Sequence, residues 1–330
     1  MPPTRRPSSQ RTPRSPQSQR NQPSQRSALT PARSGRLRRR VAYSQNFLRD
    51  YRVADQVLER SGIGPDDVVY EIGPGEGVIT ERLALRCRHV VAVEKDPRLV
   101  ERLRRRFSGR PNVTIFESDF LDFPLPATRY KVFANVPFNV TAAIVSKLTS
   151  ARYAPEDVYL GVQKESAQRF MGSPAESLVA VLLKPWFEPA IVHRFSRTDF
   201  FPVPGVDVVM LRLRKRGPPL LSPAEATLYR DFVAYGFTAW RPSLRYAYRE
   251  VFDGQRLAHV GRVLRIDLDT TPSALPFEGW LALYRYFASA SDARMRARIA
   301  GAEARLRQQQ STLHKVHRTR AAVAAGSQPP

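Results

Sequence analysis

Residues 69–84 read VYEIGPGEGVITERLA, and this stretch decides the fold. An apolar run ends in Gly73, Gly75 and Gly77, and a helical pattern follows directly. Glycines let the backbone turn sharply and approach a ligand closely, and the N-terminus of the following helix favours polar acceptors. The spacing is neither the dinucleotide G-x-G-x-x-G nor the phosphate-binding G-x-x-x-x-G-K-[ST]. By itself, such a loop is also explained by a tight structural turn.

Strand and helix patterns alternate on both sides of this loop. Apolar runs indicate strands at 67–73, 89–96, 112–119, 130–138 and 157–165. Helical spacing of apolar residues appears at 51–61, 78–86, 97–107 and 141–149. Two later runs, 190–196 and 206–216, surround DFFPVPG like a hairpin that closes the sheet. This order predicts an α/β fold with a doubly wound, mostly parallel, Rossmann-like sheet.

Beyond residue 216 the pattern becomes wholly helical. Apolar residues recur three and four apart at 224–237, 244–251, 256–264 and 277–287. We therefore expect an α/β domain over 41–216 and a small all-helical domain over 217–290. The chain of 330 residues is long enough for these two domains.

The formal net charge of +23 is concentrated at the two ends. Residues 1–40 carry eleven arginines and no acid, and residues 288–330 carry eight basic and two acidic side chains. Their composition predicts a disordered basic arm over 1–40 and a basic, disordered tail over 291–330. Arginine-rich arms release counterions from a phosphate backbone, which favours a nucleic-acid partner. A purely solubilising role for these ends stays open.

Other classes of protein are disfavoured. The N-terminus lacks the apolar core of a signal peptide, and no run of about 18 apolar residues occurs. We expect a cytoplasmic protein with no membrane contact, although an arginine- and serine-rich start is also typical of transit peptides. Cys87 is the only cysteine, which excludes an internal disulfide and argues against a metal site.

Polar residues follow three further strands. Glu94 ends the second strand, Asp119 the third and Asn135 the fourth. A carboxylate at Glu94 can accept hydrogen bonds from both hydroxyls of a ribose, an arrangement that NAD enzymes share. Asp119 can accept a hydrogen bond from an adenine amino group. Together with the glycine loop, these strand ends predict a ligand crevice at the carboxyl edge of the sheet.

The stretch FANVPFNVT at 133–141 suits methyl transfer to an exocyclic amine of adenine. That nitrogen is a poor nucleophile because its lone pair is delocalised into the ring. Hydrogen bonds to the Asn135 side chain and to the Val136 or Pro137 carbonyl would make it more tetrahedral. Pro137 fixes the turn, and Phe138 offers a flat face on which an extruded base can stack. No charged general base is needed, because a sulfonium donor leaves as a neutral thioether.

Motifs across 41–290 resemble the ribosomal RNA adenine N6-methyltransferases, the family that contains the Erm resistance enzymes and the KsgA-type dimethyltransferases. The matching motifs are SQNFL (44–48), EIGPGEG (71–77), VEKD (93–96), SDFLDF (118–123), NVPF (135–138) and FFPVPGVDVVMLRL (200–213). The resemblance implies a class I methyltransferase fold that binds S-adenosylmethionine and no metal.

The resemblance also implies roles for individual residues. Those implied for the cofactor are Asn46 and Leu48 at its methionine and ribose end, Gly73 and Gly75 at its methionine moiety, Glu94 and Lys95 at its ribose, and Asp119 and Phe120 at its adenine. Asn135 would lie between the methyl donor and the target amine. Phe138 would form one wall of the base pocket, and either Phe200 or Phe201 the opposite wall. Two departures are Phe138, where tyrosine is commoner, and Gly205, where relatives carry a basic or bulkier residue.

The segment 182–204 and the arginine-bearing helical region are more similar to Erm than to KsgA-type enzymes. This implies one adenine of 23S rRNA near the peptide exit tunnel as the target, in protein-free or early assembly RNA. It also implies a monomer that confers macrolide, lincosamide and streptogramin B resistance. The alternatives are a KsgA-type enzyme acting on two 16S adenines, a DNA adenine methyltransferase and a non-catalytic RNA-binding factor. The motifs do not distinguish one added methyl group from two.

Overall fold

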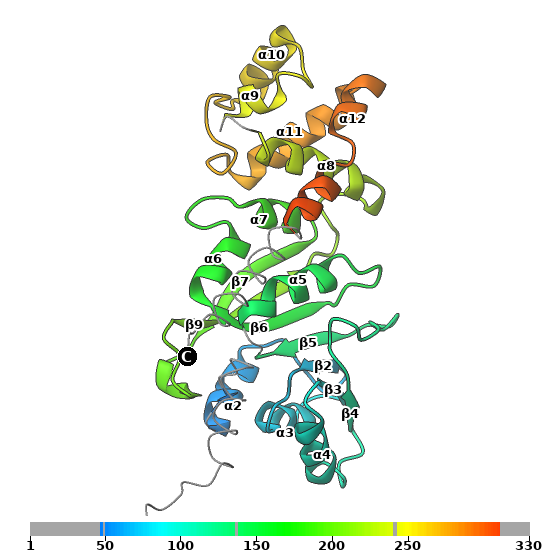
Figure 1. The fold of residues 1–330 in the computed structure, drawn as a ribbon, viewed down its shortest axis with the longest axis vertical. Coiled ribbons are helices and arrows are strands. Elements are labelled where there is room, and N and C mark those ends of the chain that lie inside the picture. The colour runs from blue at the N-terminus through cyan, green and yellow to red at the C-terminus, as the bar shows by residue number, and fades with distance from the viewer. Residues whose placement is uncertain (1–46, 49, 136–137, 240–242, 311–330) are drawn as a thin grey trace, which may run out of the picture. The chain divides into compact units, whose positions relative to one another are not determined.

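A computed structural model describes residues 47–48, 50–135, 138–239 and 243–310 (Figure 1). Seven strands form one sheet in the order β4-β3-β2-β5-β6-β9-β7. They are β2 (Val68–Ile72), β3 (His89–Glu94), β4 (Val113–Glu117), β5 (Lys131–Ala134), β6 (Asp157–Gln163), β7 (Phe187–Arg194) and β9 (Val208–Lys215). All neighbouring pairs are parallel except β6 with β9 and β7 with β9. The mostly parallel sheet and its closing hairpin are thus confirmed.

Helices cover both faces of the sheet. They are α2 (Tyr51–Glu59), α3 (Val78–Ala84), α4 (Pro97–Arg106), α5 (Thr141–Thr149), α6 (Lys164–Met171) and α7 (Leu178–Leu183). In β3, Val90 and Ala92 pack with α2 and α3, whereas Val91 and Val93 pack on the face that carries α5 and α6. Because helices cover both faces, the central strands β2, β3 and β5 are mostly apolar, as the sequence pattern indicated. The short helices α6 and α7 were not among the predicted elements.

The strand order creates a switch point between β2 and β5. From β2 the chain builds outward through β3 and β4, and then returns to place β5 and β6 on the other side. Ile72 pairs with Val93 on one side and with Ala134 on the other. The residues that follow these three, Gly73, Glu94 and Asn135, therefore lie at one edge. This is the edge at which open α/β sheets bind ligands.

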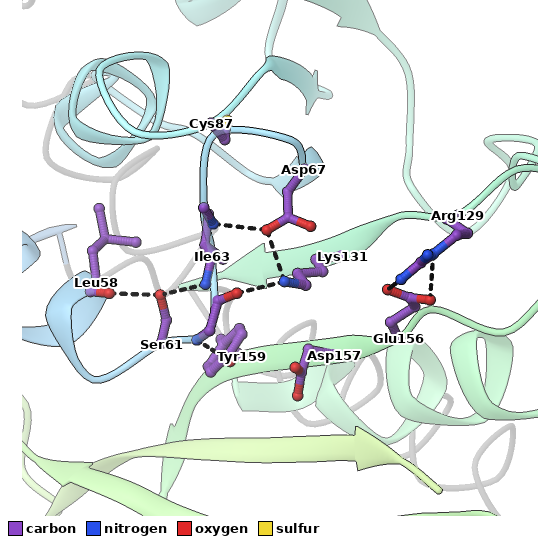
Figure 2. A network of polar contacts seen from close by, with 12 residues as sticks. Leu58, Ser61, Ile63, Asp67, Cys87, Arg129, Lys131, Glu156, Asp157 and Tyr159 are labelled. Atoms are coloured by element: carbon purple, nitrogen blue, oxygen red, sulfur yellow. Dashed lines mark hydrogen bonds and ion pairs between the residues drawn. The ribbon is translucent and has the colours of Figure 1, made fainter. Parts of the chain in front are cut away.

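The opposite, amino-terminal edge is tied together by polar contacts (Figure 2). The Lys131 ammonium donates to the Asp67 carboxylate at 2.7 Å and to the Gly62 carbonyl. The Gly62 N–H in turn donates to the Tyr159 hydroxyl at 2.7 Å. These contacts join the turn after α2 to the first residues of β5 and to β6. Farther along the same edge, Arg129 and Glu156 form an ion pair.

The helices after β9 have a core of their own. They are α8 (Ala226–Phe237), α9 (Leu244–Tyr248), α10 (Gly254–Leu264), α11 (Phe277–Ala290) and α12 (Ala293–Ile299). Phe232 stacks on Tyr248 at 4.7 Å between ring centroids, and Trp280 is fully buried beside them. The predicted helical region is present, and none of the described helices is both long and apolar enough to span a membrane.

The expectation of a disordered tail from residue 291 is wrong for residues up to 310. Asp292 caps α12 by accepting the Met295 N–H at 2.8 Å, and Met295 and Ile299 are buried in the helical core. Residues 302–310 are also helical, and the buried Asp231 accepts N–H groups at the start of that segment. The sequence pattern did not indicate this ordered segment, because it is rich in charged residues and contains few apolar side chains. The arm 1–40 and residues 311–330 lie outside the described residues.

The amino-edge network generates a prediction about stability. Lys131→Met should lower the free energy of unfolding by about 1–3 kcal/mol, because it leaves the half-buried Asp67 carboxylate without its cation. Arg129→Met is the matched control, and it should cost much less, since that arginine side chain is 86% exposed against 13% for Lys131. Urea unfolding of the three proteins measures the difference. Equal losses in the two variants would contradict a structural role for the buried contact.

Candidate active site

The glycine loop adopts a conformation that other residues rarely reach. The φ angles of Gly73, Gly75 and Gly77 are 65°, 60° and 83°. A Cβ atom at Gly77 would also lie 2.8 Å from the Phe107 ring and 2.9 Å from Leu103. The loop therefore passes directly against the residues that end α4. Glycine is required here both for backbone conformation and for space.

Glu94 joins this loop to the end of the neighbouring strand. Its buried carboxylate accepts the Gly75 N–H at 3.2 Å through Oε2, and the Lys95 and Asp96 N–H groups at 2.9 and 3.0 Å through Oε1. Burial raises the pKa of Glu94, and the backbone donors partly oppose that effect. Each carboxylate oxygen has a further lone pair with which it can accept a ligand hydroxyl. The side chain of Lys95 is exposed beside it.

Glu71 is a second buried carboxyl group at this edge, and the motif analysis assigned it no role. The pKa of Glu71 is raised to about 8, chiefly by burial; polar contact with Thr80 opposes the shift, and the nearby Glu94 adds to it. Glu71 Oε2 and Thr80 Oγ1 have no hydrogen-bond partner among the described residues. Buried polar atoms are seldom left unpaired, so this spot suits a donor group of a bound ligand. The signal in the sequence was an acid inside an otherwise apolar strand.

Arg106 of α4 supports the loop from its outer side. Its guanidinium donates to the Glu76 carbonyl at 2.6 Å, to the Tyr51 hydroxyl at 2.6 Å and to the Glu81 carboxylate at 2.5 Å. Tyr51 also donates to Glu81 at 3.1 Å. One arginine thereby connects α2, α3 and the loop. Sequence reasoning missed it, because Arg106 stands in a run of three arginines with no feature that distinguishes it.

The loop after β4 holds Asp119 and Phe120 at the same edge. Asp119 is exposed, and its carboxylate accepts the Leu121 N–H at 2.9 Å. Phe120 is buried, and the Lys147 ammonium from α5 donates to the carbonyls of Phe120, Leu121 and Phe123 at 2.6–2.7 Å. Lys147 therefore fixes the loop while the Asp119 carboxylate stays accessible to a ligand.

Asn135 follows β5 directly and is half-buried. Its Oδ1 lies against Gly161 of β6, where a Cβ atom would come within 2.8 Å of that oxygen. Because Ala134 pairs with Ile72, Asn135 stands beside the start of the glycine loop. Phe138 begins the turn η1 (Phe138–Val140), which leads into α5. Val136, Pro137 and the side chain of Phe138 lie outside the described part of the chain.

A two-stranded pair brings two distant motifs together. In β1 (Phe47–Leu48) and β8 (Phe200–Phe201), Leu48 pairs with Phe200. Phe200 is 1% exposed and packs edge-on against Phe195 at 5.1 Å, so it is a core residue and offers no open face. Phe201 is 49% exposed, so of the two rings it is the one that reaches the surface. Leu48 is buried, and Asn46 lies outside the described residues.

The groups at this edge fit S-adenosylmethionine. Glu94 and Asp119 can accept hydrogen bonds from groups such as its ribose hydroxyls and adenine amine, and the Glu71 Oε2 beside the loop, unpartnered among the described residues, suits a donor group. The glycine loop permits close backbone approach. Within the described ranges, no group of three or more histidine, cysteine or acidic side chains is placed to hold a metal ion.

The raised pKa of Glu71 generates a pH prediction. A carboxyl group whose pKa is raised by folding stabilises the protein most below pH 4.5, which is its pKa in the unfolded chain. This contribution to the free energy of unfolding is lost as the pH rises from about 4.5 to about 8. Glu71→Gln should flatten this decline in the free energy of unfolding. We assign the pH dependence that remains in this variant to Glu94, whose pKa is also raised by burial. The control is Glu101→Gln, an exposed acid on α4. An unchanged slope in urea unfolding across pH 5–8 would show that Glu71 is ionised in the fold.

Comparison with known proteins agrees with this geometry. A family model described as ribosomal RNA adenine dimethylase matches residues 36–289. An rRNA adenine N-6-methyltransferase from Saccharopolyspora erythraea is 37% identical over 62% of this chain, which spans about half (54%) of that relative. Ribosomal RNA small subunit methyltransferase A from Synechococcus is 33% identical over 74% of this chain and 91% of its own length.

Among solved structures, the crystal structure of the 23S rRNA methyltransferase ErmE is similar to this fold. Its TM-score is 0.67 at 32% identity, over 73% of this chain and 98% of that chain. The family match covers the glycine loop, the three polar strand ends and most of the helical region. The chain thus belongs to the ribosomal RNA adenine dimethylase family, and it is an S-adenosylmethionine-dependent rRNA adenine N6-methyltransferase.

Proposed function

We propose that the protein methylates N6 of one adenine in 23S rRNA, before that RNA is fully assembled with protein. The observation that carries the proposal is the position of Asn135 beside the glycine loop at the switch point. The similarity to ErmE supports 23S rRNA as the substrate. Methylation near the peptide exit tunnel would block macrolide, lincosamide and streptogramin B binding. We place this activity in the cytoplasm and assign it to a monomer.

Different side chains at the carboxyl edge bind different parts of the cofactor and thereby position it. Glu94 accepts ribose hydroxyls and Asp119 the adenine amine of the cofactor, while the loop from Gly73 to Gly75 lies along its methionine moiety. When bound, S-adenosylmethionine supplies an electrophilic methyl group on a positively charged sulfur. Lys95, at the strand end, adds positive charge beside the ribose site. These contacts hold the donor in the orientation that displacement requires.

Asn135 prepares the target amine for attack. Its side-chain oxygen and the carbonyl of Val136 or Pro137 accept the two amine hydrogens, which makes the nitrogen lone pair available for the methyl carbon. The new N–C bond would form as the C–S bond of the donor breaks, and the methylated nitrogen would then lose a proton to water. The target base reaches this position by leaving its stack and lying between Phe138 and Phe201.

A transfer experiment tests the proposed substrate. Purified protein and S-adenosylmethionine with a labelled methyl group are mixed with protein-free 23S rRNA and, separately, with small ribosomal subunits. Label at one adenine of 23S rRNA is the expected result. Label in the small subunit would instead support the second candidate, a KsgA-type enzyme, which the similarity to the Synechococcus small-subunit methyltransferase favours. No transfer to either RNA would contradict both.

Asn135→Ala should lower kcat by about 10²–10³-fold, because it removes an acceptor that acts on the reacting nitrogen. Cofactor affinity should stay within about threefold, since the Glu94 and loop contacts remain. Single-turnover methylation and calorimetric titration with S-adenosylhomocysteine measure the two effects. A loss of cofactor affinity with unchanged turnover would remove Asn135 from the proposed role.

Arg106→Gln should raise the KM for S-adenosylmethionine about tenfold, because the glycine loop loses a charge-assisted hydrogen bond to its Glu76 carbonyl. The rate at saturating cofactor should change much less. Arg105→Gln is the control, since among the described residues the ion-pair partner of its exposed side chain is Glu101 of the same helix, at 3.5 Å. Equal KM values in the two variants would show that the loop holds its shape without Arg106.

A further inference from the structure

Helix α12 lies beyond the residues that the family model matches, which end at 289. It is nevertheless built into the helical core. Met295 and Ile299 are buried there, and the Arg256 guanidinium of α10 contacts the Met295 sulfur at 3.3 Å. This extension therefore has a defined position against α10, and it presents its remaining side chains in a fixed arrangement.

A cleft of about 700 Å³ separates α12 from the segment between α9 and α10. Four arginines line it, two from each side: Arg249 and Arg256, and Arg294 and Arg298. All four are exposed. The helices of the matched region supply one wall, and the extension supplies the other. Without α12 there would be an arginine-bearing surface but no cleft.

The three acids in the cleft are occupied by contacts within the protein. Asp253 accepts the Arg256 N–H at 2.7 Å at the start of α10, and Asp292 accepts the Met295 N–H at the start of α12. Glu250 pairs with Arg298 and lies 3.8 Å from Arg249. Within the described residues, the guanidinium groups of Arg256 and Arg294 have no carboxylate partner. They supply unneutralised positive charge on the two facing walls.

We propose that this cleft binds a stretch of phosphate backbone of the RNA substrate, at a distance along the chain from the methyl-transfer residues. This rests on the proposed function, which supplies RNA as the partner. Guanidinium groups match phosphate oxygens in pairs and stay charged at all working pH values. Phe252 and Met295, the large apolar side chains of the lining, are buried in the core, so the cleft offers no exposed apolar anchor for a protein partner. Contacts of this kind hold the RNA in register and carry no sequence information.

The test uses the full-length double variant Arg256→Gln/Arg294→Gln. The matched control is Arg88→Gln/Arg110→Gln, which removes two exposed charges before β3 and β4, at the opposite edge of the sheet from the cofactor. The Kd for the RNA that the wild type methylates is measured at several salt concentrations. Loss of two phosphate contacts should lower the slope of log Kd against log salt by about 1.4–1.8. The rate at saturating RNA should stay within about twofold of the wild-type rate.

Each outcome decides between the cleft and its alternatives. An unchanged slope, or the same change in both double variants, would overturn the proposed RNA-binding role of the cleft. Such a result would leave only general electrostatic attraction between protein and RNA. Unchanged RNA binding together with lost binding to an acidic ribosomal protein would assign the cleft to a protein partner. A wild-type protein that methylates no RNA would contradict the proposed function instead, so the two failures are distinguishable. Equal unfolding temperatures verify that both double variants are folded.

Discussion

The hydrogen bond from the Gly75 N–H to the Glu94 carboxylate joins two strand ends, and the geometry of the site depends on it. A glycine-rich loop has many conformations to lose on folding, so an external contact is needed to hold it. Glu94 supplies this contact from the inside, while its other oxygen accepts the two backbone groups that follow it. Arg106 holds the Glu76 carbonyl from the outside. The loop is thereby shaped before any ligand arrives.

The two edges of the sheet do different work. At the amino-terminal edge, polar groups are paired with one another, as in the contacts of Lys131 with Asp67 and Gly62. At the carboxyl edge, acceptors are held in place by backbone donors and keep further lone pairs for a ligand, as in Glu94 and Asp119. Pairing at one edge stabilises the sheet, and spare acceptors at the other can accept hydrogen bonds from a ligand. The Glu71 carboxyl, whose Oε2 has no hydrogen-bond partner among the described residues and whose pKa is raised by burial, belongs to the second class.

Much of this arrangement could be predicted from the sequence, and the exceptions have physical reasons. Buried parallel strands are continuous apolar runs, so β2, β3 and β5 and the polar residues that end them were recognisable. The pair β1 and β8 was not, because two residues on each side have no periodicity and their contact joins segments about 150 residues apart. Phe200 is buried and Phe201 is exposed, a difference that two identical adjacent letters in a sequence cannot reveal. Likewise, α12 was not predicted, because its segment is mostly charged and only a few of its residues are apolar and pack into the core.

A crystal structure with bound S-adenosylhomocysteine would measure where the cofactor lies. The geometry predicts ribose hydroxyls within hydrogen-bonding distance of Glu94, the adenine amine beside Asp119 and the sulfur on the Asn135 side of the glycine loop. That result would place the methyl donor next to the residue proposed to hold the target amine. A ligand bound away from the β2–β5 switch point, or with its sulfur remote from Asn135, would contradict this assignment of the active site.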